Sequence, residues 1–398
     1  MKTVYFEILS LFLIIISSIM IFYLLKLIFK RKIKQKSSPN PPSNYTPPPP
    51  RVPPSQEICN AIKSSNFILE KGWKGKEIMP SANQGWDFFV GTDPTHGHVS
   101  YDSWSFLLKP YGDSLRIDVD SIPVGKGRRS VRLITTDKYV TDETKDFLFI
   151  IDAEHIPEGL SVWPAFWLVG IPDELTENKY QISNWACYGE IDIIEGVNSV
   201  KEDADSNINL SSLHTNKVVG QDDCIQGGVL GINNFRCDAS SSDLYTCGCN
   251  GNERCPNIGC SQKKGLFGNS FNNSGGGVYT CQLISGQVTI WFFPRNNIPN
   301  DIMCGKPDPS SWPNEDAVAR NKNAGITISK FNPCSGHFKN LMLVLNTTIC
   351  GEFAGSTFKN GSDTGLDACE AFSVDPDNTY SDAFWYINYI KIFTRATA

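Results

Sequence analysis

The chain has 398 residues, 13 of them cysteine, and a formal net charge of −6. Its 40% hydrophobic and 11% aromatic content, with 32 glycines and 24 prolines, excludes a disordered chain or a coiled coil and indicates a globular protein with many turns. The first 36 residues hold seven bases and one acid, which leaves 29 bases against 41 acids in the remainder. Because that surface would repel phosphates, we expect no nucleic-acid partner, whereas a neutral polysaccharide fits.

Residues 8–25 form an uninterrupted uncharged run near the start of the chain, mostly Ile, Leu and Phe. At about 1.5 Å per residue, the run and its extension past Lys26 reach roughly 27 to 33 Å, enough to cross a bilayer core. A signal peptide has a shorter apolar core, and no convincing small-residue cleavage site follows the run. The sequence therefore predicts an N-terminal transmembrane helix with a basic flank at residues 1–36.

The orientation of this predicted anchor receives conflicting signals. Five bases follow the apolar run within residues 30–36 and only Lys2 precedes it, which by the positive-inside rule places the body in the cytosol. Twelve of the cysteines follow residue 180 and indicate disulfides formed in the secretory pathway. Five glycosylation sequons agree with that compartment, at Asn44, Asn209, Asn272, Asn346 and Asn360. Because the cysteines concern the whole domain, we expect a membrane-anchored protein whose body is extracellular or in the secretory lumen.

The rest of the chain divides into a linker and one domain. Residues 37–55 contain nine prolines, which favour extended polyproline II and predict a spacer of roughly 50 Å. From residue 56 to 398, short runs rich in β-branched and aromatic residues alternate with turn signals, without a long helical period. Such runs lie at residues 146–151, 288–293, 341–345 and 384–393. The pattern predicts an all-β fold, a β-sandwich jelly roll.

The run Gly-Glu-Ile-Asp-Ile-Ile-Glu-Gly at residues 189–196 carries the candidate catalytic groups. On a strand, Glu190 and Asp192 share one face, and strict alternation turns Glu195 to the other face. A one-residue β-bulge between Asp192 and Glu195 would restore it, with the two isoleucines between them turned toward the core. A helix would not gather these acids, since positions five apart diverge by about 140°.

Three acids on one face repel one another, so the run is either an acidic surface strand or part of a reaction site. Retaining glycoside hydrolysis needs two carboxyls about 5 to 5.5 Å apart, one ionised to attack the anomeric carbon and one protonated to assist the leaving oxygen. Mutual repulsion separates their pKa values. On this hypothesis Glu190 is the nucleophile and Glu195 the acid/base, while Asp192 helps to set which glutamate keeps the proton.

The run E-I-D-I-I-E also matches the active-site signature of family 16 glycoside hydrolases, and the chain resembles the fungal-type endo-1,3(4)-β-glucanases, the laminarinase-like enzymes of that family. In the bulged signature of the family the first Glu is the nucleophile and the last is the acid/base. Six further segments stand in the order such enzymes show: DPTHGHVSY (93–101), WPAFWLVG (163–170), LHT (213–215), GGGVY (275–279), IWFFPRN (290–296) and CGEFAG (350–355).

The resemblance implies a concanavalin A-like jelly roll with a concave substrate cleft, and a retaining endo-β-glucanase acting on 1,3- or mixed 1,3-1,4-β-glucan. Two other hypotheses stay open. A cell-wall transglycosylase shares the covalent step, and a non-catalytic β-glucan-binding protein shares the fold, although a binder gains nothing from two paired glutamates. The cysteine-dense segment after His214 exceeds what the family leads us to expect and leaves the chain-length preference open. We expect a monomer.

Four residues are candidates for substrate binding. Trp167 and Trp185 flank the predicted strand, and exposed indole rings serve as platforms for the flat C–H faces of sugars, with core packing as the alternative. His214 resembles the histidine that family members carry beside the cleft; the alternative is an ordinary satisfied polar group. Arg295 could bind sugar hydroxyls with its fork of donors, or form a salt bridge. Trp163, beside a proline, is interpreted as structural.

No metal or cofactor is predicted. The cysteines at 247, 249, 255 and 260 lack the paired Cys-x-x-Cys spacing of a structural zinc module, and a secreted setting favours disulfides. Members of the resembled family sometimes hold a structural calcium, but no loop here identifies such a site. We expect Cys350 and Cys369 to pair, and Cys187, three residues before Glu190, is our guess for the unpaired thiol.

Overall fold

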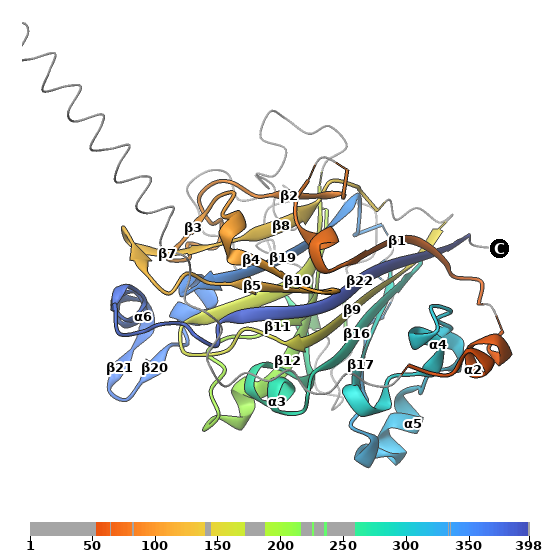
Figure 1. Cartoon of the computed structure of the whole chain (residues 1–398). Coiled ribbons are helices and arrows are strands. Elements are labelled where there is room, and N and C mark those ends of the chain that lie inside the picture. Colours follow the sequence, from red (N-terminus) through yellow and green to blue (C-terminus); the bar gives the residue numbers. More distant parts are fainter. Residues whose placement is uncertain are drawn as a thin grey trace, which may run out of the picture. The chain divides into compact units, whose positions relative to one another are not determined.

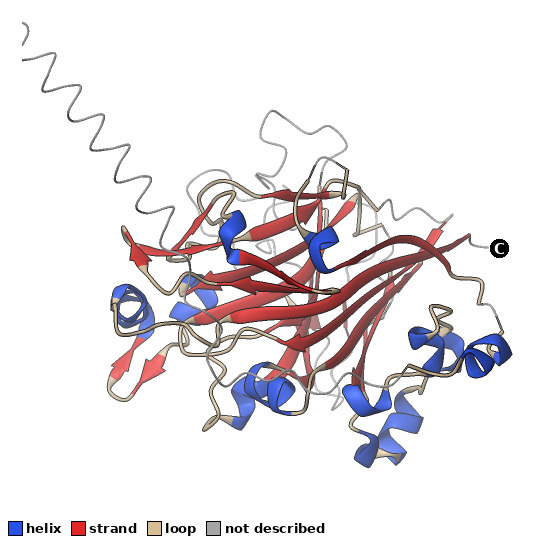
Figure 2. Ribbon diagram, viewed as in Figure 1, coloured by secondary structure: helices blue, strands red, loops and turns tan. Residues whose placement is uncertain are grey.

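The computed structural model describes residues 53–63, 65–81, 83–139, 145–171, 188–215, 225–226, 235–236, 259–332, 334 and 336–396. Antiparallel strands dominate these residues, and the helices lie around them (Figure 1, Figure 2). Within this part of the chain, no helix has the length and apolar character needed to cross a membrane. The predicted anchor and most of the linker fall in residues 1–52, outside the described residues, so the anchor stays a prediction.

The first large sheet, sheet A, has eight strands. β1 (Ile68–Lys74) pairs with β22 beside the main path. Along that path the strands follow in the order β18 (Thr327–Lys330), β17 (Gln287–Pro294), β16 (Gly277–Ile284), β9 (Lys145–His155), β22 (Phe384–Ala396), β5 (Ser114–Asp118) and β4 (Leu108–Tyr111).

The second large sheet, sheet B, has seven strands and contains the run with the three acids. Its order is β15 (Cys260–Leu266), β12 (Ile208–His214), β11 (Glu190–Glu195), β10 (Val162–Gly170), β19 (Leu341–Ile349), β8 (Arg132–Thr135) and β2 (Trp86–Phe88). Strand β11 is therefore an interior strand, paired on one side with β10 and on the other with β12.

Smaller elements surround the two sheets. A three-stranded sheet contains β3 (Val99–Tyr101), β7 (Gly127–Ser130) and β6 (Pro123–Val124), and two hairpins join β13 (Ile225–Gln226) to β14 (Phe235–Arg236) and β20 (Lys359–Asn360) to β21 (Asp363–Thr364). The α-helices described are α2 (Gln56–Ala61), α3 (Gly268–Asn273), α4 (Asn300–Met303), α5 (Glu315–Arg320) and α6 (Gly365–Val374). Single turns are η1 (Gly75–Ile78), η2 (Ser105–Leu107), η3 (Ala204–Asn207), η4 (Arg295–Asn297), η5 (Pro309–Ser311), η6 (Lys322–Ala324) and η7 (Gly351–Gly355).

The hydrophobic core lies between sheets A and B and follows the alternation of the strands. In β9, Phe147, Phe149 and Ile151 point into the main core, whereas Leu148 and Ile150 belong to a second cluster on the opposite face of sheet A. Burying each such side chain stabilises the fold by roughly 1.5 to 3 kcal/mol. Two sheets packed on one core confirm the predicted all-β sandwich.

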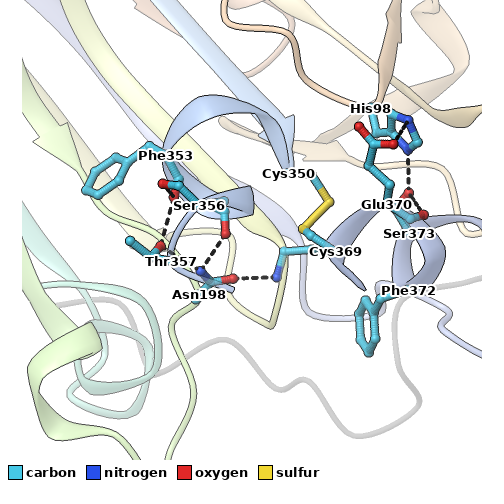
Figure 3. Close-up of a disulfide and its surroundings, with 12 residues drawn as sticks. His98, Asn198, Cys350, Phe353, Ser356, Thr357, Cys369, Glu370, Phe372 and Ser373 are labelled. Carbon is cyan, nitrogen blue, oxygen red and sulfur yellow. Dashed lines mark hydrogen bonds and ion pairs between the residues drawn. A yellow bond between two sulfur atoms is a disulfide. The ribbon is translucent and has the colours of Figure 1, made fainter. Parts of the chain in front are cut away.

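Two disulfides are placed in full within the described residues. Cys350 and Cys369 are joined as predicted, and Cys59 is joined to Cys304. The first closes a loop with a sequence separation of 19; loops of this size limit the unfolded chain and typically contribute about 3 kcal/mol. Figure 3 shows this bridge beside η7. Nearby, Asn198 Nδ2 donates to the carbonyl of Ala354, which links the segment after β11 to the segment after β19.

The other cysteine predictions have mixed outcomes. Cys260, from the group considered for zinc, is disulfide-bonded. Its companions at 247, 249 and 255 lie outside the described residues, as does Cys187. Among the described cysteines, Cys281 is free and fully buried in the core. The guess that Cys187 is unpaired stays a prediction.

Candidate active site

The predicted β-bulge is present in β11. Against β10, Asp192 pairs with Trp167 and Glu195 with Ala165, and the register shifts between them so that Ile193 is the extra residue. Because directly opposed residues of antiparallel strands point to the same side, and the partners of Glu190, Asp192 and Glu195 on β10 alternate regularly, the three acids share one face of sheet B.

The isoleucines between the acids explain why the three acids point away from the main core. Ile191, Ile193 and Ile194 have no exposed surface and lie in the main core. Ile193 and Ile194 are adjacent, so in a regular strand they would point to opposite faces. A bulge lets both point inward while Glu195 stays on the face of Glu190 and Asp192. The acids consequently lie on the opposite face of sheet B, the face that carries a smaller apolar cluster with Val169 and Met342.

The two glycines that bracket the run are required by close contacts. Gly189 has φ +81°, and a Cβ there would approach the carbonyl oxygen of His337 to 2.5 Å. A Cβ at Gly196 would approach the ring of Phe267 to 2.5 Å. Glycine therefore allows the strand to enter and leave the sheet beside packed neighbours, and a side chain at either end would displace the strand that holds the acids.

Glu195 has the protonation state of a general acid. Burial, followed by the charge of Asp192, raises the pKa of Glu195 to about 8, while His214 and a hydrogen bond from Trp163 lower it. The Trp163 Nε1 donates to Glu195 Oε1 at 3.0 Å. Burial also raises the pKa of Asp192 to about 8. At neutral pH a pKa near 8 keeps the Glu195 carboxyl mainly protonated, as proton donation requires.

His214 lies against the same acids, as the sequence predicted. It pairs with Glu190 across β11 and β12, and its Nε2 is 3.3 Å from Asp192 Oδ2. One ligating atom each from Glu190, Asp192 and His214 lies within 4.8 Å of the others. Such nitrogen and oxygen donors suit a divalent metal, but acid–base chemistry on the strand explains the same grouping, and no metal is predicted from the sequence.

Arg132 is a site residue that the sequence analysis missed. It is 3% exposed on β8, and its guanidinium lies 4.9 Å from the ring centre of Trp167. Burial lowers the pKa of Arg132, whereas the charges of Asp93 and Glu190 raise it. The Arg132 guanidinium therefore interacts electrostatically with Glu190. Nothing in the spacing of the sequence marks this arginine, because β8 joins β10 only through β19.

Trp163 is buried, as its structural interpretation requires, and it also contacts Glu195. The side chain is 8% exposed, but its indole nitrogen holds Glu195, and its ring packs edge-on against Phe353 at 5.6 Å. Phe353 belongs to the η7 segment beside the Cys350–Cys369 bridge (Figure 3). The Cys350–Cys369 disulfide therefore lies beside the segment whose Phe353 packs on Trp163, and Trp163 in turn donates to Glu195.

The two tryptophans proposed as sugar platforms have different outcomes. Trp167 is half-buried, and its Nε1 donates to Asn346 Oδ1 at 2.8 Å. It shares the face of the acids, so its platform role stays a prediction consistent with its place. Trp185 falls in residues 172–187, outside the described residues.

Arg295 does not belong to this site. It follows β17 in sheet A, whereas the acids lie in sheet B. Its Nη1 is 2.7 Å from Asp152 Oδ1, and its other guanidinium nitrogens donate to the carbonyls of Gly275 and Ala153. The salt bridge that the sequence allowed is therefore present, and the sugar contact stays a prediction. Alternation along an isolated strand could not show which sheet that strand joins.

We expect Arg295→Met to lower the free energy of unfolding by about 3 kcal/mol, because it leaves the buried Asp152 carboxylate without its cation. On laminarin, the substrate that the resemblance implies, the kcat and KM of the variant are expected to stay within about twofold of the wild-type values. Urea denaturation and initial rates measure the two effects. A large rise in KM with unchanged stability would restore the sugar-binding role.

Two of the five sequons are unsuited to glycosylation in the folded protein. Asn209 is 0% exposed and Asn346 is 7% exposed, and both side-chain amides are hydrogen-bonded. Asn360 is exposed in the β20–β21 hairpin. Asn44 lies outside the described residues. Burial thus removes part of the sequon support for a secretory compartment.

Two packed antiparallel sheets, with a bulged strand that carries three acids on its outward face, define a β-jelly-roll protein of the glycoside hydrolase type. The model of the XgeA-like catalytic domain of glycoside hydrolase family 16 matches residues 86–393. The chain belongs to this family.

Curated relatives agree with that family. The chain is 33% identical over 360 residues to a probable endo-1,3(4)-beta-glucanase of Aspergillus fumigatus, which covers 85% of this chain and 47% of that protein. It is 34% identical over 350 residues to the endo-1,3(4)-beta-glucanase xgeA of Emericella nidulans, covering 83% of this chain and 48% of the relative. The chain thus spans about half the length of the curated relatives it matches.

Solved structures support the fold. An elongating family 16 beta-1,3-glucosyltransferase has a TM-score of 0.60 and 29% identity, covering 82% of this chain and 99% of that one. Laminarinase 16A from Phanerochaete chrysosporium, solved with beta-glucans in donor and acceptor sites, has a TM-score of 0.57 and 24% identity, with 82% and 99% covered. The predicted jelly roll is confirmed.

Proposed function

We propose that the chain is a retaining endo-β-glucanase that cleaves 1,3- or mixed 1,3-1,4-β-glucan. The observation that carries the proposal is the bulge of β11, because it places Glu190, Asp192 and Glu195 on one face. The pKa of about 8 at Glu195 supports the division of roles. The family supports the substrate class, since its relatives are named endo-1,3(4)-beta-glucanases.

The reaction follows from those roles. The Glu190 carboxylate attacks the anomeric carbon, the bond from that carbon to the leaving oxygen breaks, and Glu195 gives its proton to that oxygen. A covalent glycosyl ester on Glu190 results. Glu195, now ionised, takes a proton from water, whose oxygen attacks the anomeric carbon and releases Glu190. Two inversions give net retention. Asp192 and His214, 3.3 Å apart, adjust the charge next to Glu195 during both proton transfers.

A second candidate is transglycosylation, in which a sugar hydroxyl replaces water in the second step. The observation that favours it is the similarity to a chain named as an elongating beta-1,3-glucosyltransferase. The covalent step is identical in both cases. The difference lies in how well the acceptor side excludes water, which depends on residues around the acid/base rather than on the three acids.

The experiment incubates the purified full chain with laminarin, lichenan and cellulose and follows product mass together with new reducing ends. We expect short β-1,3-linked oligomers and a steady rise of reducing ends with laminarin. Products longer than the substrate at a constant number of reducing ends would indicate transfer. Unchanged length distributions for all three polymers would reject both enzymatic candidates and leave a binding protein, to be measured by retention on insoluble glucan.

We also propose that residues 1–36 tether the domain to a membrane with residues 56–398 on the extracellular or lumenal side. The Cys59–Cys304 and Cys350–Cys369 disulfides support an oxidising compartment.

A further inference from the structure

Beyond Asp192, the backbone of β12 does not pair with the backbone groups of β11. β11 pairs with β12 through Glu190, Ile191 and Asp192, and this pairing then stops. On that edge the backbone groups of the next residues face β12, and every residue of β11 except Glu195 is buried. Buried N–H and C=O groups require partners, so something other than the strand ladder must satisfy Ile193 and Glu195.

The side chain of Asn209 meets this need. The Glu195 backbone N–H donates to Asn209 Oδ1 at 3.1 Å, and Asn209 Nδ2 donates to the carbonyl of Ile193 at 3.0 Å. Asn209 Nδ2 also donates to Ser211 Oγ at 3.2 Å, and that hydroxyl donates to the same carbonyl at 3.3 Å. One amide therefore spans the bulge on both sides of Ile194.

We propose that Asn209 is a positioning residue for the acid/base, a role that rests on the proposed function. Its two-sided contact gives the Glu195 N–H an acceptor and the Ile193 carbonyl a donor in the bulged register. Without Asn209, the Glu195 N–H loses its acceptor and the Ile193 carbonyl loses one of its donors. The regular, unbulged pairing of β11 then competes with the bulged register. A one-residue slip turns the following side chain to the other face, so Glu195 would leave the face of Glu190.

Neither direct substrate contact nor glycosylation accounts for the presence of Asn209 at this position. The side chain has 0% exposure, so it contacts neither solvent nor a polysaccharide. A glycan on its amide nitrogen would replace a hydrogen that the bulge uses. The residue therefore acts through Glu195, and its loss should impair proton donation while sparing nucleophilic attack.

The test compares full-chain wild type with Asn209→Ala on laminarin and on an aryl β-laminarioligoside whose leaving group needs little protonation. We expect kcat on laminarin to fall about 10²-fold, within the usual contribution of a general acid, with KM changed less than about threefold. On the activated substrate, kcat/KM, which reports the first step, should fall less than about tenfold, since Glu190 remains in place and the leaving group needs little protonation. The basic limb of the kcat/KM profile on laminarin should shift or disappear.

The matched control is Asn272→Ala in α3. Asn272 Oδ1 accepts from the Ile156 N–H at 2.8 Å and its Nδ2 donates to the Ile156 carbonyl at 2.9 Å, the same two-sided contact in a segment after β9. It is also a sequon asparagine. This variant should lower the thermal midpoint while the ratio of the two substrates' rates stays at the wild-type value.

Three results would overturn the proposal: wild-type kcat on laminarin in Asn209→Ala, equal proportional losses on both substrates, or the same substrate split in Asn272→Ala. If Asn209→Ala does not fold, Asn209→Leu replaces it, because Leu has a similar volume and neither donor nor acceptor; full laminarin activity in that variant contradicts the proposal. If the wild type cleaves neither substrate, the proposed function fails. A crystal structure of Asn209→Ala then decides, and an unchanged register between β10 and β11 rejects the positioning role.

Discussion

Replacing Glu190 by Ala should reduce the cleavage of laminarin by about 10⁴-fold or more, the largest effect that we expect from any single substitution. The side chain is 8% exposed at the start of β11, with its face set by the pairing of β10. Removing its carboxylate leaves no group to form the covalent glycosyl ester. Added azide, which fits the space of the missing carboxylate, should restore release from an activated aryl glycoside and give the α-glycosyl azide.

Circular dichroism and the thermal midpoint serve as the folding control for Glu190→Ala, since the residue makes no contribution to the main core. The stereochemistry of the azide product separates the roles of the two glutamates, because rescue at an acid/base position gives the β-anomer. A folded Glu190→Ala protein with full activity on laminarin, or one rescued to the β-azide, would show that Glu190 is not the nucleophile.

Replacing Glu195 by Gln should lower kcat on laminarin by about 10² to 10⁴-fold, because Gln cannot donate the proton that the sugar oxygen needs. An aryl glycoside with a good leaving group should lose far less in the first step. In the wild type, kcat/KM should fall as the pH rises through about 8, where Glu195 ionises. Initial rates across pH 5 to 9 for both proteins measure this, and a basic limb retained in Glu195→Gln would assign it to another group.

The same substitution should raise stability at high pH. The pKa of Glu195 is raised in the folded protein from an ordinary value of 4.5 to about 8. A raised pKa means that the folded state binds the proton more tightly, so its stabilising contribution is complete below pH 4.5 and is lost as the pH rises toward 8. Gln has no such loss, and Glu195→Gln should be more stable than wild type at pH 8 by about 1 to 3 kcal/mol.

Urea denaturation at pH 4 and pH 8 measures that difference. The two proteins should converge at the lower pH, which lies below the ordinary pKa of 4.5, because Glu195 is then mainly protonated in the folded and the unfolded state. Asp192 contributes in the same direction, because burial raises its pKa to about 8 as well. An identical pH dependence for wild type and Glu195→Gln would contradict the raised pKa and, with it, the assignment of Glu195 as the proton donor at neutral pH.

The contacts around the acids divide into those that a local pattern predicts and those that it does not. The bulge could be predicted because its cause lies within six consecutive residues: three isoleucines must be buried, and three acids must not face them. Trp163, Arg132 and Asn209 could not, since each acts on β11 from another strand, Arg132 through its charge and the other two through hydrogen bonds. Their effect on the acids depends on which strands are neighbours.

Composition, spacing and periodicity by themselves determined the all-β class, the face shared by Glu190, Asp192 and Glu195, and the Cys350–Cys369 pairing, because each of these depends on residues near one another in the chain or on properties summed over it. The order of strands in two sheets was decided only by the tertiary structure. Because of that order, Arg295 follows a strand of sheet A, Trp163 lies within hydrogen-bonding distance of Glu195, and Asn209 contacts the backbone on both sides of Ile194. The physical reason is that side-chain alternation shows which residues of a strand share a face but not which strands lie next to it. Side chains on those adjacent strands are the buried partners that set the charge and the position of the acids.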